Sequence, residues 1–360
     1  MKTNTLGVAV VGAGADHWSS AAHLPAIAAL DELRLNGLVT SSPESAVAAA
    51  ERWGTVATHE LDRVLADETV DIVAVTVRVP RHAEIVKAAI AAGKHVYCEW
   101  PLATGSKQAR DLAELSAAHP DKVHVTGLQG RYSPHLRTAA ALLTSGRIGR
   151  PLSANLRLHL PHGLLPRPAH RAHLRHRSVG ANVLTIQAGH ALDMLGVVLG
   201  RPQVDSARLW SAVPEFLVDT GERLPRDAPD TLVTVLDHAG VITVAHVSQT
   251  GPRETFALEV LGTEGSLTLT GTSQPQFGGL TLTVTPLGGA PSEEIAPDVD
   301  LAHPSPLPAS HAGHNVASAY AALAAAVRDG HRDPLLPDFR AAVDLHDLLD
   351  EIEQAAVGKR

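Results

Sequence analysis

Two glycines near the start of the chain have the spacing of a phosphate-binding turn. Gly12-Ala13-Gly14 follows an apolar run over residues 6–11 and precedes a segment with helical spacing over residues 21–30. A turn between a strand and a helix directs backbone N–H groups and the helix N-terminus toward an anion such as a pyrophosphate. His17 stands where the usual fingerprint has a third glycine. The strand–turn–helix context favours a dinucleotide site over a tight turn without a ligand.

The residues after the next predicted strand indicate whether the cofactor is NAD or NADP. A carboxylate usually binds the ribose hydroxyls of NAD at this point. This chain has Thr40-Ser41-Ser42 after the predicted strand over residues 33–39. Hydroxyl groups accept a 2′-phosphate without charge repulsion, so NADP is allowed as well as NAD. No arginine follows immediately, and the preference for NADP is therefore weak.

Glu99-Trp100-Pro101 closes a further predicted strand over residues 95–98. The indole N–H is a donor only and does not titrate near neutral pH, so Trp100 cannot act as a general acid or base. Its ring can lie beside a nicotinamide, cover the apolar face of a sugar or fill a hydrophobic space. Cys98, the single cysteine of the chain, is expected in the core and excludes an internal disulfide, which fits a reducing compartment.

Charge is unevenly distributed along the chain, whose net charge is -8. No acidic residue lies between Asp121 and Asp193, an interval rich in arginine that holds eight of the 21 histidines. Such asymmetry indicates an anionic ligand or an internal match with acids elsewhere in the fold. Both interpretations stay open.

His170, His173 and His176 have the spacing of metal ligands. The arginines between them repel a cation, and no cysteine or carboxylate joins them, so we predict no metal site. A loop that closes over an anionic or polyhydroxyl substrate fits the composition better. Nucleic-acid binding is disfavoured because the chain is acidic overall and carries no known motif.

The alternation of strands and helices predicts an α/β fold with an N-terminal Rossmann domain, a doubly wound parallel sheet, over residues 1–128. Residues 129–360 predict an α+β substrate and oligomerisation domain with an open, mostly antiparallel sheet and closing helices within 313–357. Its expected helices are 133–145 and 182–199, and its expected strands are 152–160, 207–212, 232–236, 241–247, 256–261, 267–269 and 280–284. We expect a homodimer or homotetramer formed through the open sheet. No signal peptide or membrane-spanning run is seen, and the cytoplasm is the expected location.

Several motifs in a fixed order resemble those of the Gfo/Idh/MocA oxidoreductase family. They are Gly12-Ala13-Gly14, His23-Leu24-Pro25-Ala26-Ile27, Val79-Pro80-Arg81-His82, Ala92-Gly93-Lys94-His95-Val96, Glu99-x-Pro101-Leu102-Ala103 and Gly189-His190-Ala191-Leu192-Asp193. The resemblance covers nearly the whole chain. It implies a dehydrogenase with a dinucleotide cofactor and a cis peptide before Pro101.

A subgroup within that family is similar over further stretches. Glu99-Trp100, Trp18, Leu128-Gln129-Gly130-Arg131-Tyr132-Ser133-Pro134 and Ser145-Gly146-Arg147-Ile148-Gly149 resemble the fungal galactose-regulon repressor and its bacterial relatives. That repressor has the dehydrogenase fold but works by binding a transcription activator. The narrower likeness therefore implies a regulator as an alternative to an enzyme.

The family surrounds the reacting carbon with a lysine, an aspartate and a histidine. Trp100 replaces the lysine and Ile186 replaces the aspartate, so only His190 is left to serve as base toward a hydroxyl or acid toward a ketone. Asp193, one helical turn on, is expected to orient its ring. Tyr132 is a further candidate for proton transfer. A satisfied histidine with no catalytic role is an equal alternative for His190.

The same resemblance implies the remaining site residues. The expected cofactor-binding residues are Gly12, Ala13, Gly14, His17, Trp18, Thr40, Ser41, Ser42, Val79, Pro80, His82, Glu99, Trp100, Pro101 and Gln129. The expected substrate residues are Arg131, His162 and Gln187. The leading hypothesis is an NAD(P)-dependent oxidoreductase acting on a sugar, polyol or related hydroxyl or keto compound. A non-catalytic dinucleotide-binding regulator and non-redox chemistry are the alternatives.

Overall fold

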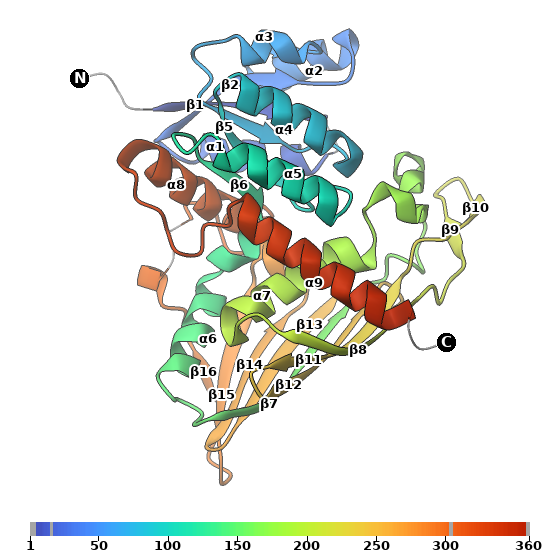
Figure 1. Cartoon of the computed structure of the whole chain (residues 1–360), viewed down its shortest axis with the longest axis vertical. Coiled ribbons are helices and arrows are strands. Elements are labelled where there is room, and N and C mark those ends of the chain that lie inside the picture. Colours follow the sequence, from blue (N-terminus) through green and yellow to red (C-terminus); the bar gives the residue numbers. More distant parts are fainter. Residues whose placement is uncertain (1–4, 15–16, 302–304, 358–360) are drawn as a thin grey trace. The chain divides into compact units, whose positions relative to one another are not determined.

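The structure is a computed structural model that describes residues 5–14, 17–301 and 305–357 (Figure 1). The chain forms two compact units. The first comprises Met1–Gln129 with His303–Asp344, and the second comprises Gly130–Ala302 with Leu345–Arg360.

The first unit is built on a six-stranded sheet in the order β3-β2-β1-β4-β5-β6, in which every pairing is parallel. Its strands are β1 (Leu6–Val11), β2 (Leu33–Val39), β3 (Ala57–Thr58), β4 (Ile72–Val75), β5 (His95–Glu99) and β6 (His124–Gly127). Every residue of β1 and β4 is buried, as continuous apolar strands in the middle of a parallel sheet require. The predicted doubly wound sheet is confirmed.

The helices of this unit begin and end where the local sequence allows. They are α1 (Leu24–Ala28), α2 (Pro43–Trp53), α3 (Leu61–Leu65), α4 (His82–Ala91), α5 (Ser106–Ala117) and α8 (His314–Asp329). In α2, for example, the Ser42 hydroxyl accepts from the N–H of Ser45, Pro43 occupies the first turn and Gly54 ends the helix at φ +62°. A π-helical turn over Ser19–His23 leads into α1.

The segment around α8 lies with the first unit, although we expected the closing helices to belong to the second domain. Tyr320 on α8 is fully buried and its hydroxyl bonds His23, at the start of α1. Beyond α8, the N–H of Thr126 on β6 donates to the carbonyl of Pro337 at 2.8 Å. The open edge of the sheet thereby gains a partner, which explains why this C-terminal segment returns to the first sheet. The functions assigned to the two domains stay predictions.

The second unit contains an eight-stranded sheet in the order β16-β15-β14-β13-β7-β12-β11-β8. Its strands are β7 (Pro151–His159), β8 (Gln203–Trp210), β11 (Thr231–His238), β12 (Val241–Ser248), β13 (Thr255–Gly262), β14 (Gly265–Gly271), β15 (Leu280–Pro286) and β16 (Glu293–Ile295). Only β7 and β12 pair in parallel, so the predicted mostly antiparallel sheet is confirmed. A separate hairpin joins β9 (Glu215–Leu217) to β10 (Arg223–Pro225).

Helices α6 (Pro134–Thr144) and α7 (Gly189–Leu199) pack together in this unit, and α9 (Phe339–Val357) begins in the first unit and ends in the second. The inner face of the sheet is apolar, with Leu156 and Leu158 of β7 beside Ala245 and Val247 of β12, all buried. On the outer face, Asn155 and Arg157 of β7 alternate with them, whereas β12 exposes Ile242 and Val244.

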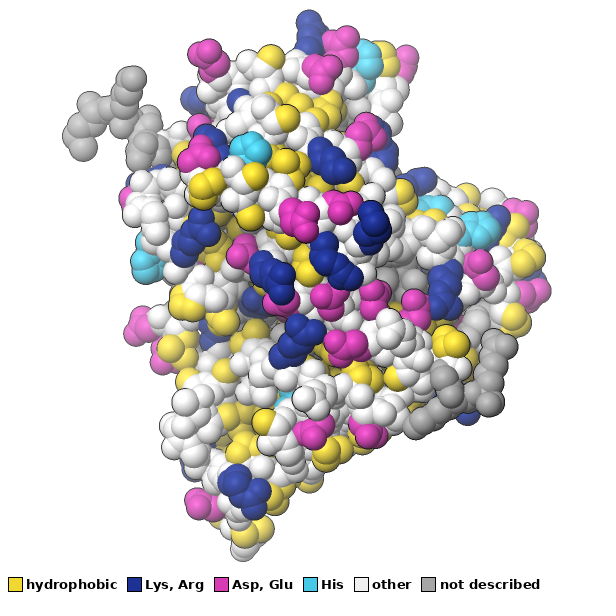
Figure 2. All heavy atoms as spheres, in the orientation of Figure 1, with side chains coloured by type: hydrophobic (Ala, Val, Ile, Leu, Met, Phe, Trp, Pro, Cys, Tyr) yellow, Lys and Arg dark blue, Asp and Glu magenta, His cyan; other side chains and the backbone are white. Residues whose placement is uncertain are grey.

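Acidic and basic side chains are interspersed on the face of the molecule seen in Figure 2, with hydrophobic side chains scattered among them. Some of these opposite charges form ion pairs along single helices, such as Arg340 with Asp344 on α9. Among the described residues, no helix combines the length and the apolar character needed to cross a bilayer.

Candidate functional site

The turn after β1 requires glycine at residue 12 and is tightly covered at Gly14. Gly12 has φ +107°, and a Cβ there would lie 3.0 Å from atoms of Thr76. A Cβ at Gly14 would lie 2.8 Å from the imidazole of His17, whose Nδ1 is 3.3 Å from the Gly12 carbonyl. The His17 ring therefore covers the turn, where a third glycine would leave it open. Ala13, between the two glycines, is buried.

Two serines hold this turn from the helical side. The Ser19 hydroxyl donates to the carbonyl of Gly12 at 2.9 Å, and the Ser20 hydroxyl donates to the carbonyl of Gly14 at 2.8 Å. Both carbonyl oxygens thus point toward protein donors, which reduces the electrostatic repulsion that an approaching phosphate would meet. Trp18 precedes them, half-buried, with its ring edge-on to His23 at 6.4 Å.

The hydroxyls after β2 already have partners within the protein at two of three positions. Thr40 donates to the carbonyl of Ser42 at 3.1 Å, and Ser42 caps α2. Ser41 is exposed and makes no side-chain hydrogen bond to the described residues. Ser41 is therefore the hydroxyl that remains available for a ribose or a 2′-phosphate, and the choice between NAD and NADP stays a prediction.

Glu99 ends β5 and belongs to a buried chain of hydrogen bonds that the sequence did not reveal. Its carboxylate lies 3.1 Å from Nε2 of His23, whose Nδ1 lies 2.9 Å from the Tyr320 hydroxyl. A carboxylate only accepts, so Nε2–H donates to Glu99 and the Tyr320 O–H donates to Nδ1. Burial, with the charge of Glu99, raises the pKa of Tyr320, which keeps this phenol protonated. Tyr97 stacks on Tyr320 at 4.8 Å and closes the cluster.

Trp100 and Pro101 follow, joined by the expected cis peptide bond. The Trp100 side chain is buried, and so is His82 at the start of α4. His82 places Nδ1 2.9 Å from the Pro101 carbonyl and Nε2 2.9 Å from the Val77 carbonyl. Burial lowers the pKa of His82. The imidazole therefore links the segment before α4, including Val79 and Pro80, to the turn after β5.

Gln129 follows β6 and offers a buried acceptor. Its side chain is 2% exposed, and Oε1 has no hydrogen-bond partner among the described residues. A buried amide oxygen without a donor is costly. The carboxamide N–H of a nicotinamide is the kind of hydrogen-bond donor that this oxygen lacks.

Parallel strands bring these residues to one edge of the first sheet. The residues that follow the carboxyl ends of β1, β4, β5 and β6 are the glycine turn, Val79-Pro80, Trp100-Pro101 and Gln129. Dinucleotides bind at this edge of doubly wound sheets. The glycine turn, with Gly12 at positive φ, and the unsatisfied Gln129 oxygen fit such a ligand, which would lie across β1, β4, β5 and β6.

In the second unit, His190 lies on α7 directly after a π-helical turn over Val183–Ala188. Asn182 starts that turn, its Oδ1 accepting from the N–H of Leu184 at 2.9 Å. Single π-helical turns are frequent at functional sites. His190 and Gln187 are 5% and 7% exposed, so solvent reaches both only slightly. Ile186 is half-buried at the position that the family gives to aspartate.

Arg131 binds Asp193 in a forked ion pair. Its Nε lies 3.0 Å from both carboxylate oxygens of Asp193, and Nη2 lies 2.6 Å from Oδ1. The backbone carbonyl of Arg131 accepts from Arg137, whose guanidinium also covers the Tyr132 ring at 4.9 Å. Arg131 was expected to contact the substrate and Asp193 to orient His190. The structure adds this mutual pairing, and both expected roles stay predictions.

The third expected substrate residue, His162, lies 3.5 Å from Glu254. Burial, followed by the charges of Arg167 and Arg171, lowers the pKa of His162 to about 4. His170 and His173, whose spacing resembles that of metal ligands although no metal site was predicted, lie on the short helical turn Ala169–Arg175. Within the described part of the chain, no three His, Cys, Asp or Glu side chains are placed to hold a metal ion.

Comparisons with known proteins agree with this architecture. Residues 6–126 match the model of an oxidoreductase family with an NAD-binding Rossmann fold, and residues 136–268 match the Gfo/Idh/MocA C-terminal domain. The dehydrogenase aclE of Aspergillus oryzae is 33% identical over 74% of this chain and 77% of its own length. The chain belongs to the Gfo/Idh/MocA oxidoreductase family. Its first unit is accordingly an NAD-binding Rossmann domain.

Solved structures of this family include both enzymes and regulators. A mutant of Gal80p from Saccharomyces cerevisiae superposes with a TM-score of 0.86 at 21% identity, covering 99% of this chain and 97% of the other. A levoglucosan dehydrogenase in complex with NADH and levoglucosan gives 0.84 at 21% identity, covering 99% and 98%. At this identity both show the shared fold, and the resemblance to the galactose regulators is confirmed at that level.

Proposed function

We propose that this Gfo/Idh/MocA protein is an NAD(P)-dependent oxidoreductase that transfers hydride to or from a sugar, polyol or related hydroxyl or keto compound. The observation that carries the proposal is the edge of the first sheet, where the glycine turn, Glu99 and the unsatisfied oxygen of Gln129 lie at the carboxyl ends of β1, β5 and β6. The 33% identity to the dehydrogenase aclE supports it. Acting on sugars is further supported by the NADH and levoglucosan complex of a structural neighbour.

A bound nicotinamide supplies or accepts the hydride, and this chain's residues manage binding and the proton. His190 takes the proton from a substrate hydroxyl, or gives it to a keto oxygen. Trp100 contributes an apolar wall and one N–H, but no titratable group. General acid–base help is worth about a hundred- to ten-thousandfold, so a site without the family's lysine turns over slowly.

The test is a cofactor-reduction assay. NAD⁺ and NADP⁺ are each mixed with levoglucosan, myo-inositol, galactose and sorbitol, and absorbance of the reduced nicotinamide is followed. We expect reduction with at least one pair. Cofactor affinity is measured in parallel by NADH fluorescence.

Two glycine variants separate cofactor binding from backbone strain. Gly12→Ala and Gly93→Ala both place a side chain at positive φ, +107° and +68°, so both strain the backbone. A Cβ at Gly93 meets no atom within 4 Å, and this residue precedes β5, on the edge opposite the expected cofactor. NADH affinity should fall in Gly12→Ala and persist in Gly93→Ala. Equal affinities in the two variants would count against the site.

A regulator is the second candidate function, and the buried Trp100 and the aliphatic Ile186 favour it. In this case the protein binds NADH tightly, reduces no cofactor with any substrate, and cofactor binding alters its affinity for a protein partner. Reduction of either cofactor that depends on His190 excludes this alternative.

We further propose that copies associate through the outer face of the eight-stranded sheet, as a dimer or tetramer. Ile242 and Val244 of β12 are 44% and 43% exposed there. Light scattering on Val244→Glu should show a smaller species than the unmodified protein. The cytoplasmic location stays a prediction.

A further inference from the structure

Four basic side chains gather in the second unit, from segments well separated in the sequence. Arg226 follows β10, and Arg167, Arg171 and His162 come from the long loop after β7. The backbone of Arg167 is fixed to β9, because its N–H donates to Leu217 and its carbonyl accepts from Asp219, both at 2.9 Å. The loop carrying three of these residues is thus fastened to the β9–β10 hairpin.

Gly163 brings the same loop close to Arg226. Its N–H donates to the carbonyl of Gln249 at 2.7 Å, and a Cβ at this glycine would lie 3.4 Å from Nη1 of Arg226. His162 is therefore one residue from the point where the loop meets the buried guanidinium. Side-chain exposure of Arg226 is 5%.

The cluster has more positive than negative groups. Burial, then the charges of Arg171 and Arg226, lower the pKa of Arg167 to about 10. Glu254 is the carboxylate near Arg167, and it already accepts from Ser273 at 3.0 Å and faces His162. The guanidinium of Arg167 forms no hydrogen bond or ion pair with any described residue. The carboxylates that act on these guanidinium groups are Glu254, near Arg167, and Asp230, beside Arg226.

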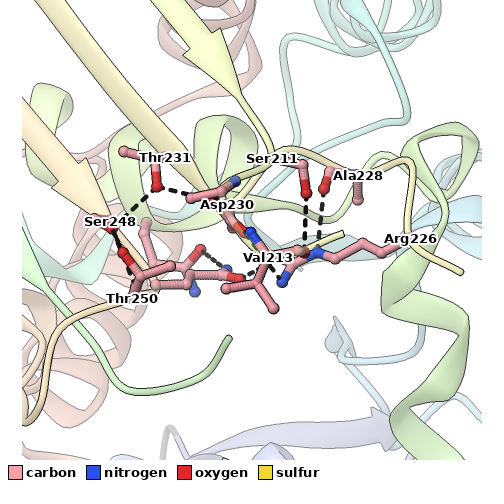
Figure 3. A network of polar contacts seen from close by, with 11 residues as sticks. Ser211, Val213, Arg226, Ala228, Asp230, Thr231, Ser248 and Thr250 are labelled. Carbon is pink, nitrogen blue, oxygen red and sulfur yellow. Dashed lines mark hydrogen bonds and ion pairs between the residues drawn. The ribbon is translucent and has the colours of Figure 1, made fainter. Parts of the chain in front are cut away.

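Asp230 is committed to the protein itself. It accepts from the N–H groups of Ala212 and Val213 at 2.8 and 2.9 Å and from the Thr231 hydroxyl at 2.8 Å. Figure 3 shows this network, which continues from Thr231 to Ser248 and Thr250. Asp230 therefore compensates Arg226, which lies 3.7 Å away, and leaves Arg167 and Arg171 in excess over Glu254.

Hydrogen bonds connect this cluster to the helix that carries His190. Nη2 of Arg226 donates to Oε1 of Gln249 at 2.6 Å, and Nε2 of Gln249 donates to Oε1 of Gln187 at 3.0 Å. Gln187 lies three residues before His190. The basic cluster and the expected proton donor are thus fixed relative to each other within one unit.

We propose that Arg167 and Arg171, with His162 of the same loop, form a subsite for an anionic group on the substrate. The substrate is then a hydroxyl or keto compound that carries a carboxylate or a phosphate, such as a sugar acid or a sugar phosphate. The planar fork of arginine matches either oxyanion. This inference rests on the proposed function only in assigning the bound anionic group to a substrate. The anion site itself is testable without a cofactor.

The experiment measures anion binding by the full-length protein without nucleotide. Inorganic phosphate and acetate are titrated calorimetrically at constant ionic strength. D-glucose 6-phosphate, D-glucuronate and D-glucose follow, to distinguish a phosphate from a carboxylate. We expect saturable binding of at least one inorganic probe, and a Kd for the matching sugar at least tenfold below that of D-glucose.

Variants decide whether the named residues are responsible. Arg167→Gln and Arg171→Gln should each raise the Kd of the anion at least tenfold, and Arg167→Lys, which keeps the charge but loses the fork, should give an intermediate value. Arg223→Gln is the matched control, since Arg223 is an exposed arginine of the same hairpin, paired with Glu215. Its Kd should not change. Circular dichroism confirms that each variant is folded.

The outcomes separate this inference from the proposed function. Absence of saturable binding, or binding unaltered in Arg167→Gln and Arg171→Gln, overturns the anion subsite. NADH fluorescence on the same samples tests the function independently. Cofactor reduction with neutral sugars alone would support the oxidoreductase and contradict the anion subsite. Anion binding without any NADH binding would support the anion subsite and contradict the oxidoreductase.

Discussion

The guanidinium of Arg131 donates three hydrogen bonds of 2.6 to 3.0 Å to the carboxylate of Asp193, although the two residues are 62 positions apart in the sequence. Their side chains are 17% and 4% exposed, so the pair is largely withdrawn from water. Asp193 belongs to α7, three residues after His190. The ion pair therefore fixes the helix that carries the expected proton donor.

Breaking this pair should destabilise the protein strongly. Asp193→Asn leaves the Arg131 charge buried and uncompensated, for which we expect a loss of about 3–5 kcal/mol in the free energy of unfolding. Urea denaturation of Asp193→Asn, Arg131→Met and the double variant measures the coupling. The double variant should lose less than the sum of the two single changes. Additive losses would show that the pair does not interact energetically.

The hydrogen bond from Tyr320 to His23 should stabilise the first unit and support Glu99. Tyr320→Phe keeps the stacked ring but leaves Nδ1 of His23 buried without its donor, for which we expect about 1–3 kcal/mol of destabilisation. NADH affinity should also fall, because His23, the partner of Glu99, loses the hydrogen bond that fixes its ring. The control is Arg328→Gln, an exposed residue of the same helix. Unchanged unfolding in Tyr320→Phe would contradict the account.

A lysine at residue 100 tests whether a titratable side chain at this position accelerates the reaction. If the site performs hydride transfer, Trp100→Lys should raise the rate of the chemical step, up to the hundred- to ten-thousandfold that acid–base catalysis supplies. Trp100→Phe removes the indole N–H without adding a titratable group and should not accelerate it. Stopped-flow absorbance of the nicotinamide measures both. A faster rate in Trp100→Phe than in Trp100→Lys would argue against acid–base chemistry at this position.

Stability should decline in mild acid because of a buried histidine. Burial lowers the pKa of His124 to about 4, whereas an unfolded histidine titrates near 6.5. Between these values the unfolded state binds more protons, so the free energy of unfolding falls as pH drops from about 6.5 to about 4. Above that window the contribution is constant.

The matched variant is His124→Asn, whose amide can still bond the Ser116 hydroxyl. It should show a shallower loss of stability between pH 6.5 and 4 in urea titrations. The remaining slope is expected from His95 and His162, whose pKa values burial also lowers to about 4. A slope identical to that of the unmodified protein would show that the pKa of His124 is the same in the folded and unfolded states.

Local sequence patterns predicted most of the elements. The predicted strands 33–39 and 95–98 appear as β2 and β5, because strand-forming segments of this length are visible without tertiary context. The strands β3, β9, β10 and β16 were missed, since two or three residues give no periodicity. The parallel pairing of β7 with β12 was also invisible, because nothing in either strand encodes its neighbour.

The candidate site was predicted in part for the same reason. Gly12 and the Trp100-Pro101 dipeptide can be recognised from the sequence alone. His23 was noted within a motif, but its partner Tyr320 lies 297 residues away and its role could not be inferred. Likewise, an arginine-rich loop was evident, whereas the convergence of Arg167 with Arg226 depends on the β9–β10 hairpin.

The most direct measurement of the central claim is an anaerobic single turnover. Protein in excess is mixed with NAD⁺ or NADP⁺ and the sugar, polyol and sugar-acid panel, and reduced nicotinamide is followed at 340 nm. The account predicts reduction that His190→Ala lowers at least a hundredfold, with NADH binding unchanged. Tight NADH binding with no reduction by any member of the panel, or reduction unaltered in His190→Ala, would contradict it.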